Sequence, residues 1–321
     1  MRRGPRLAAP MDYPLRVRIY EVGPRDGLQN ESAPIPTDAK LAYIALLRAA
    51  GLREIEATSF VSPRAIPQLA DADQLLPALL DVAAADAVRF PVLVPNMRGM
   101  ERAEAAGASA LAVFTAASDE FTSRNIGMTI DESLAEFKPV LQRATALGWW
   151  KRAYVSTAFG CPFSGRVEAS KVVDVALRLV ELGADEICLG DTIGVGVPSQ
   201  VHALTKATTE AGLPLDRLAY HFHDTRGTAL ANVVAGLEDG VTCFDSSTGG
   251  TGGCPYAPGA AGNLATEDLV YLLDGLGIQH GVDLGGVLQA ARFIAAALGK
   301  PLASKVGQAG GWNPATGERL I

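Results

Sequence analysis

The sequence predicts an α/β protein folded as a closed (β/α)₈ TIM barrel with additional C-terminal helices. Along the 321 residues, short runs rich in β-branched and apolar residues alternate with longer Ala/Leu-rich segments. Such alternation is typical of parallel strands joined by helical crossovers. We count eight strand candidates, and eight strand–helix units close into a barrel of about 250 residues. Several helical segments also end at glycine, which favours the position just after a helix.

The elements follow one another in a regular order. The predicted strands cover residues 16–22, 54–58, 90–94, 110–115, 152–157, 186–190, 218–223 and 243–247. The predicted helices between them are Thr37–Ala50, Met100–Ala106, Glu132–Leu147, Ala169–Leu182, Gln200–Ala211 and Thr228–Leu237. An open doubly wound sheet is the alternative, but the glycines of "EVGPRDGLQN" lack the dinucleotide-binding spacing. We expect a disordered tail over 1–14, a catalytic barrel with its C-terminal helices over 15–305, and a flexible tail over 306–321.

Composition narrows the range of partners. Hydrophobic residues make up 48% and charged residues 20%, enough for a sizeable core. A net charge of −7 and a pI of about 5.2 argue against nucleic acid as a partner. No apolar stretch reaches the roughly 18 residues of a membrane span, and the N-terminus lacks the apolar region of a secretory signal. The four cysteines show no CxxC spacing, so we expect reduced thiols in a cytoplasmic protein.

In a barrel, chemistry lies at the C-terminal ends of the strands. Polar residues should therefore converge at strand ends, whereas polar residues at strand starts should not. The residues that pass this filter are Arg25 and Asp26 after the first strand, Glu56 in the second, Arg152 and Tyr154 in the fifth, Asp191 at the end of the sixth, His221 and His223 in the seventh, and Cys254 and Asn263 in the loop after the eighth.

The stretch "YHFHDTRG" is the strongest single indication of a metal site. Residues i and i+2 on a strand point to the same face, so His221 and His223 project together into the barrel mouth. Asp26 is the natural carboxylate to complete the site, and Asn263 could add an amide oxygen. Mixed nitrogen and oxygen ligands without a thiolate favour one Mg²⁺ or Mn²⁺. The alternative is a pair of packed core histidines, since HxH alone is a weak motif.

Three other residues carry two interpretations each. Glu56 lies in a strand, where a carboxylate must be paired or functional, and Arg25 could be a purely structural partner. Asp191 could equally cap or brace the loop that follows it. Cys254 lies in a loop with too much glycine to pack as core, which suggests a thiol on a lid that donates or accepts a proton.

The chain resembles the 3-hydroxy-3-methylglutaryl-CoA lyase family, within the metal-dependent barrel lyases and Claisen-type synthases. The similar segments reach from about residue 20 to about residue 302 and include "EVGPRDGLQNE", "EATSFVSPRAIPQ", "GCPFSGRV", "LGDTIGVG", "HFHDT" and "GGCPYAPGAAGNLATEDLVYLLDGLGI". The run 252–268 is the most specific of them, whereas "PRDG" alone would not separate the lyases from the synthases.

The resemblance implies an activity and a role for each candidate residue. The activity would be divalent-metal-dependent retro-Claisen cleavage of 3-hydroxy-3-methylglutaryl-CoA to acetyl-CoA and acetoacetate, by a homo-oligomer, expected to be a dimer. The implied roles are metal ligation by Asp26, His221, His223 and Asn263, polarisation of the substrate oxygen by Arg25, proton transfer by Cys254, an acidic pair of Asp191 and Glu56 with His221 as relay to Asp191, and outer pocket positions for Tyr154 and Arg152.

The chain departs from the usual family pattern in three places. Arg226 and Thr228 follow "HFHDT", where a tyrosine and "GQALAN" are common, Ser32 replaces a common lysine, and Thr251 belongs to an unusual lid sequence. Arg226 could bind a differently placed carboxylate, as in citramalyl-CoA, or point outward to a surface acid.

Two other functional classes remain as alternatives. A Claisen-type synthase would usually carry a regulatory domain, for which the about fifty residues after Asp268 leave no room. A non-catalytic metal-binding barrel would not need Arg25, Glu56, Asp191 and Cys254 together at the mouth.

Overall fold

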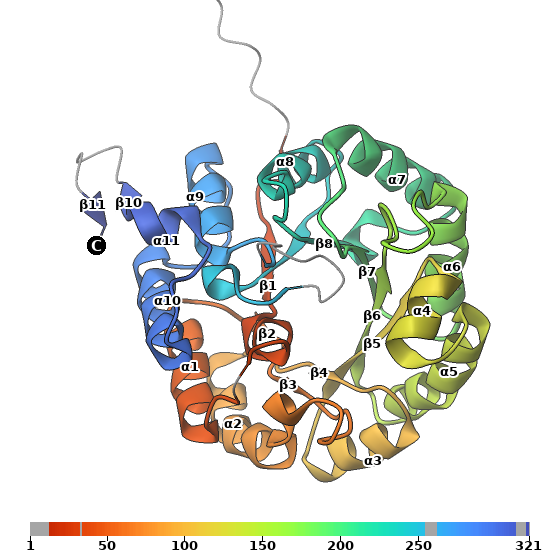
Figure 1. Ribbon diagram of the computed structural model, residues 1–321, viewed down its shortest axis with the longest axis horizontal. Helices are drawn as coiled ribbons and strands as arrows, with labels where there is room; N and C mark the ends of the chain where they lie inside the picture. The colour runs from red at the N-terminus through yellow and green to blue at the C-terminus, as the bar shows by residue number, and fades with distance from the viewer. Residues whose placement is uncertain (1–12, 33, 254–261, 313–318, 321) are drawn as a thin grey trace, which may run out of the picture.

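The protein is a parallel barrel surrounded by helices (Figure 1). The computed structural model describes residues 13–32, 34–253, 262–312 and 319–320. Within these residues, nine parallel strands form one sheet in the order β2-β1-β9-β8-β7-β6-β5-β4-β3. The strands enclose the centre of Figure 1 and the helices form the outer ring. The predicted fold class is therefore confirmed.

The barrel closes through a strand that is split in two. β2 (Glu54–Ile55) pairs with β1, and β3 (Thr58–Ser59) pairs with β4. Between them, the Glu56 amide donates to the Glu21 carbonyl at 2.8 Å, and the Ala57 amide donates to the Pro91 carbonyl at 3.0 Å. The single extended segment 54–59 thus joins both neighbours, which reconciles nine assigned strands with the eight that were predicted.

The described elements match the predicted order closely. The other barrel strands are β1 (Arg18–Glu21), β4 (Val92–Leu93), β5 (Ala110–Ala116), β6 (Trp150–Ser156), β7 (Glu186–Asp191), β8 (Leu218–Phe222) and β9 (Cys243–Ser246). The helices are α1 (Thr37–Ala49), α2 (Ala72–Asp86), α3 (Met97–Ala105), α4 (Asp119–Ile126), α5 (Ile130–Ala146), α6 (Ala169–Glu181), α7 (Pro198–Glu210), α8 (Ala229–Glu238), α9 (Thr266–Leu276), α10 (Leu284–Leu298) and α11 (Lys305–Ala309). Two helices, α2 and α4, were not predicted. The described helices are too short or too polar to span a lipid bilayer.

Part of the segment predicted as a flexible C-terminal tail is helical. The carboxylate of Asp268 on α9 accepts from the backbone amides of Lys305 at 3.0 Å and Val306 at 2.7 Å. These bonds satisfy amides at the start of α11, where a helix lacks internal partners. Beyond α11, β10 (Gly311–Trp312) pairs with β11 (Arg319–Leu320). The domain limits as a whole stay a prediction.

Two main groups of buried apolar residues build the core, beside a small third group of Ala116, Phe121 and Cys161. The larger lies between the sheet and the helices. The smaller lies inside the barrel and consists of Tyr20, Val22, Leu93, Ala112, Tyr154, Cys188, Ala219 and Cys243. Because several of these inner residues are small, the barrel interior has room for the buried charged side chains that lie among them.

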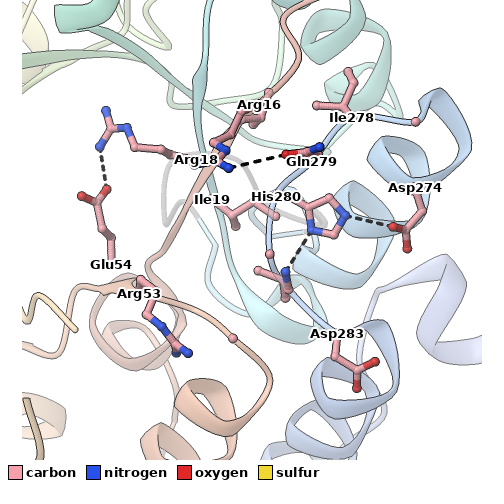
Figure 2. Close-up of a pocket in the computed structure, with 15 residues that line it drawn as sticks. Arg16, Arg18, Ile19, Arg53, Glu54, Asp274, Ile278, Gln279, His280 and Asp283 are labelled. Atoms are coloured by element: carbon pink, nitrogen blue, oxygen red, sulfur yellow. Dashed lines mark hydrogen bonds and ion pairs between the residues drawn. The ribbon is translucent and has the colours of Figure 1, made fainter. Parts of the chain in front are cut away.

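Charged residues also converge at the strand starts, contrary to expectation. Arg18 on β1 bonds to Glu54 at 2.7 Å and also contacts Glu186, while Arg89 reaches Glu54 at 2.8 Å. A cavity of about 980 Å³ lies at this end, and Figure 2 shows the ion pair Arg18–Glu54 and the hydrogen bond between His280 and Asp274. The expectation that polar residues at strand starts do not converge was wrong, because the starts of parallel strands lie as close together as their ends do.

Candidate active site

A cavity of about 450 Å³ lies at the C-terminal ends of the strands. Both apolar and polar residues line it. The apolar lining residues include Leu93, Phe114, Phe121, Ile126, Met128 and Phe137. The polar lining residues include Arg25, Asp26, Gln29, Asn96, Asn125, Tyr154, Ser156, Thr192, His221 and His223. This is the end of the barrel at which chemistry was expected.

A tight turn holds Arg25 and Asp26 at the cavity. The turn, η1 (Gly23–Gly27), is closed by the Val22 carbonyl, which accepts from the amides of Arg25 and Asp26 at 3.1 and 2.8 Å. Gly23 is required here, because a Cβ atom would lie 2.5 Å from the side-chain oxygens of Glu21 and Tyr43. Both candidate side chains therefore project from a backbone with little freedom to move.

The two histidines of β8 and its end face the same side, as predicted. Their ring centroids are 5.2 Å apart, and one ligand atom each from Asp26, His221 and His223 lie within 4.8 Å of one another. Asn263 joins them, with its Nδ2 donating to Asp26 Oδ2 at 2.8 Å. Its backbone forms a bridge with that of His223, and the amide of the next residue, Leu264, donates to the Phe222 carbonyl at the end of β8 at 2.9 Å. The four predicted ligands thus come together.

This cluster suits a divalent cation. Nδ1 of His223 and Oδ1 of Asn263 are buried and have no hydrogen-bond partner among the described residues. Despite burial, the charges of Arg25 and the histidines lower the pKa of Asp26 to about 2, and burial lowers the pKa of His223 to about 4. At neutral pH the carboxylate is ionised and the imidazole of His223 is neutral, the protonation states that metal ligation requires.

Glu56 lies beneath the cavity surface and forms hydrogen bonds with two cavity residues, Arg25 and Tyr154. Its carboxylate is fully buried and accepts from Tyr20 at 2.9 Å, from Arg25 Nε at 2.5 Å and from Tyr154 at 2.6 Å. Pairing with Arg25 was the structural interpretation, and it is the one observed. Glu56 does not line the cavity, while Arg25 and Tyr154 do.

Asp191 braces its own loop. Its Oδ1 accepts from the Val195 amide and its Oδ2 from the Gly196 amide, both at 2.9 Å. The side chain is fully buried, and burial raises its pKa. Its neighbours Gly190 and Thr192 line the cavity, but Asp191 does not. The loop-bracing interpretation therefore describes its observed contacts.

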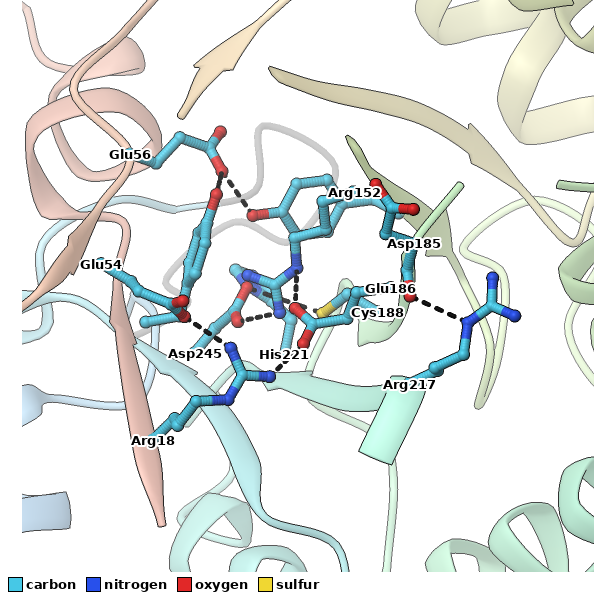
Figure 3. A network of polar contacts seen from close by, with 12 residues as sticks. Arg18, Glu54, Glu56, Arg152, Asp185, Glu186, Cys188, Arg217, His221 and Asp245 are labelled. Atoms are coloured by element: carbon cyan, nitrogen blue, oxygen red, sulfur yellow. Dashed lines mark hydrogen bonds and ion pairs between the residues drawn. The ribbon is translucent and has the colours of Figure 1, made fainter. Parts of the chain in front are cut away.

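Arg152 lies below the cavity, not at its edge. It is completely buried, its Nη2 donates to Asp245 at 2.6 Å, and its guanidinium lies 3.8 Å from the centroid of the Tyr20 ring. Figure 3 shows it at the centre of a polar network inside the barrel. The expectation of an outer pocket position is thus not met for Arg152, whereas Tyr154 does line the cavity.

Arg226 binds backbone and lines no part of the cavity. Its exposed side chain donates from Nη1 to the carbonyls of Ile193 at 2.8 Å and Gly194 at 3.0 Å. Neither a pocket carboxylate nor a surface acid is its partner in the described structure. Among the other unusual residues, Thr251 supports the site, since its carbonyl accepts from Asn263 Nδ2 at 3.0 Å.

Sequence reasoning missed several residues of the site. Of the apolar lining residues, Phe121 and Ile126 belong to α4, which was not predicted, while Phe114 and Phe137 lie in predicted elements but carry no polar group that would have marked them. Asp245, inside "CFDSS", was overlooked although a carboxylate in a barrel strand is the signal that singled out Glu56. Cys254 lies outside the described residues, so its predicted place on a lid stays a prediction.

Comparison with known proteins agrees with this geometry. The HMGL-like family model matches residues 16–294. The chain is 51% identical to hydroxymethylglutaryl-CoA lyase of Pseudomonas mevalonii, covering 91% of this chain and 96% of that protein, and 50% identical to the mitochondrial enzyme of Rattus norvegicus, covering 92% and 90%. The crystal structure of hydroxymethylglutaryl-CoA lyase from Pseudomonas aeruginosa superposes with a TM-score of 0.88 at 45% identity, covering 93% of this chain and 98% of that one. The chain therefore belongs to the HMGL-like family, in agreement with the resemblance seen in its sequence motifs.

Proposed function

We propose that the protein is a carbon–carbon lyase that cleaves 3-hydroxy-3-methylglutaryl-CoA to acetyl-CoA and acetoacetate with one Mg²⁺ or Mn²⁺. The observation that carries the proposal is the meeting of Asp26, His221 and His223 beside Arg25 in one cavity. The names of the relatives at about half identity over most of the chain support the substrate.

The candidate ligands for the ion are Asp26, His221, His223 and Asn263. A divalent ion held by them would supply Lewis acidity that lowers the pKa of the substrate's tertiary hydroxyl. The chain contributes the arrangement, because Asn263 is bonded to Asp26 and both histidines come from β8 and its end. Such a preformed set of ligands reduces the reorganisation that binding requires.

Arg25 is the proposed stabiliser of the developing enolate. Its Nε is bonded to Glu56 and its Nη1 to Asp26, so the guanidinium is fixed before substrate binds. A fixed positive charge in a mostly buried site stabilises negative charge on a thioester oxygen more than the same charge in water would. Tyr154, held by the same Glu56, would orient the acyl group.

Cleavage requires two proton movements. The hydroxyl loses a proton, the C2–C3 bond breaks with its electron pair passing to the thioester enolate, and the enolate carbon gains a proton. Cys254 is the proposed donor of that second proton. Asp191 was expected to accept the first with His221 as relay, but both of its oxygens are bonded within its loop. Acting as the base would therefore require Asp191 to exchange those bonds.

The test is a panel of 3-hydroxyacyl-CoA thioesters that includes 3-hydroxy-3-methylglutaryl-CoA and citramalyl-CoA, assayed for acetyl-CoA release. We expect the first to be cleaved fastest, with acetoacetate formed in equal amount. A chelator should abolish cleavage, and Mg²⁺ or Mn²⁺ should restore it. Faster cleavage of another thioester would show that the proposed substrate is wrong. Activity that survives complete metal removal would overturn the proposed metal-dependent mechanism.

We further propose a homodimer located in the cytoplasm. Sedimentation of the purified protein would test the homodimer, and a monomer across micromolar concentrations would contradict it.

A further inference from the structure

We propose that Asp245 is a positioning residue that selects the tautomer of His221 and thereby makes its Nε2 available to a metal ion. The inference rests on the proposed metal site, and it concerns a residue to which the family resemblance gave no role. Four contacts inside the barrel carry it.

The strand register places Asp245 beside His221. β8 and β9 are parallel neighbours, and His221 is the registered partner of Asp245. Asp245 is 1% exposed, and its Oδ2 lies 3.0 Å from Nδ1 of His221. The ring of Tyr154 meets the imidazole edge-on, with centroids 6.1 Å apart and planes at 84°. The imidazole is thus held at one nitrogen and over one side.

The other oxygen of Asp245 determines the direction of the hydrogen bond. Oδ1 accepts from Arg152 Nη2 at 2.6 Å, which stabilises the ionised carboxylate at a site with almost no solvent (Figure 3). An ionised carboxylate can only accept hydrogen bonds. Nδ1 of His221 must therefore carry a hydrogen, and in the neutral imidazole, the form that can bind a metal, Nε2 keeps its lone pair on the side of Asp26 and His223.

The two histidines differ in this respect. Nδ1 of His223 is buried and has no hydrogen-bond partner among the described residues. Of these two rings, only that of His221 is bonded to a carboxylate among the described residues. Metal-binding histidines whose second nitrogen is bonded to a carboxylate have a fixed ring orientation and a more basic ligating nitrogen. Asp245 would give this advantage to His221 alone.

Asp245→Asn tests the proposal with almost no change in volume. Arg152 is a donor, so the amide oxygen of the introduced asparagine would face it and the amide nitrogen would face His221. Nδ1 of His221 would then have to accept, and its hydrogen would move to Nε2, where it blocks ligation. We expect the affinity for Mn²⁺, measured by titration calorimetry, to fall about 10- to 100-fold.

Glu186→Gln is the matched control. Glu186 belongs to the same buried network, with an oxygen 3.2 Å from Arg152 Nε, and forms no contact with His221 among those observed. We expect this variant to keep its Mn²⁺ affinity within about twofold, provided that thermal unfolding shows both variants to be folded. An equal loss of affinity in the two variants would overturn the proposal, because it would show only that the network is structural.

Nitrogen NMR of the unsubstituted, metal-free protein gives a result that does not depend on any variant folding. We expect His221 to carry its hydrogen on Nδ1, and on Nε2 in the Asp245→Asn protein. An Nε2–H tautomer in the unsubstituted protein would overturn the proposal. If the unsubstituted protein bound no Mn²⁺, the proposed function would fail, while the NMR result would still decide the role of Asp245.

Discussion

Three buried carboxylates in the barrel have contacts that distinguish their contributions. Glu56 holds Arg25 and Tyr154, Asp245 connects Arg152 to His221, and Asp191 closes a loop. Each is almost completely buried, and each accepts hydrogen bonds at both of its carboxylate oxygens. Residue type and strand position identify such a group as important, but only its partners show whether it contacts substrate or positions another side chain.

Asp191→Asn should destabilise the protein through its loop. An asparagine can present one carbonyl oxygen, so one of the two amides now bonded to Asp191 would lose its partner in a buried site. An unsatisfied buried amide costs about 1–3 kcal/mol. Urea unfolding of the metal-free protein would measure this change. An unchanged free energy of unfolding would contradict the bracing role, and a lost acidic limb in the kcat–pH profile would add the role of base.

Cys254→Ser should separate proton transfer from metal binding. The proposed thiol moves a proton and ligates nothing, so turnover should fall far while the dissociation constant for Mn²⁺ stays nearly unchanged. Asp26→Asn is the comparison, because it should weaken metal binding and abolish turnover together. If Cys254→Ser released the metal, the cysteine would have to be assigned as a ligand.

At the scale of elements, the loop after β7 and the turn after β8 are joined by Arg226. Its two hydrogen bonds to the carbonyls of Ile193 and Gly194 connect the segments that carry Thr192 and His223 to the cavity. Gly194 also needs its positive φ of 60°, and a Cβ there would approach Thr225 to 2.7 Å. The loop after β7 and the turn after β8 are therefore closely packed, and the hydrogen bonds of Arg226 strengthen the contact between them.

Arg226→Tyr should loosen this contact without changing substrate choice. A tyrosine cannot donate two hydrogen bonds to these carbonyls, so backbone amides of the loop 191–197 should exchange hydrogen faster. The ratio of activities on 3-hydroxy-3-methylglutaryl-CoA and citramalyl-CoA should remain within about twofold, because Arg226 lines no part of the cavity. A clear shift of this ratio toward 3-hydroxy-3-methylglutaryl-CoA would contradict that expectation and restore Arg226 as a selector of substrate.

Element prediction succeeded where a pattern was local and failed where packing decided. All eight strand segments and the convergence of Asp26, His221 and His223 were predicted, and for the two histidines period-two side-chain alternation was sufficient without any tertiary information. α2 was missed, and Pro77 lies inside it. The depth of Arg152 was missed although Arg152 begins the predicted strand 152–157, because it was counted with the strand-end residues; its registered partner is Glu186 at the start of β7.

Across the whole molecule, most apolar packing lies outside the barrel, whereas a smaller apolar group and buried ion pairs share its interior. The helices pack on the outer face of the sheet, whereas the interior holds the ion pairs of Arg18, Arg152 and Arg25 with buried acids. Buried pairs contribute little net stability, but removing one partner is costly. The interior network is therefore better understood as fixing the positions of Arg25 and His221 than as stabilising the fold.

Glu267 should make the stability of the whole protein depend on pH. This residue of α9 is fully buried, its Oε2 accepts from the Gly249 amide at 2.8 Å, and its Oε1 has no partner among the described residues. Burial raises its pKa to about 7 from 4.5. The folded protein thus binds this proton more tightly than the unfolded chain, so stability is lost as pH rises from about 4.5 to about 7.

Glu267→Gln keeps an acceptor for the Gly249 amide and removes this pH-dependent loss of stability. Its unfolding free energy relative to the unsubstituted protein should rise between pH 5 and pH 8, by on the order of 1–3 kcal/mol, in metal-free urea unfolding. A difference that does not change with pH would show that the carboxylate is not protonated in the folded state near neutral pH.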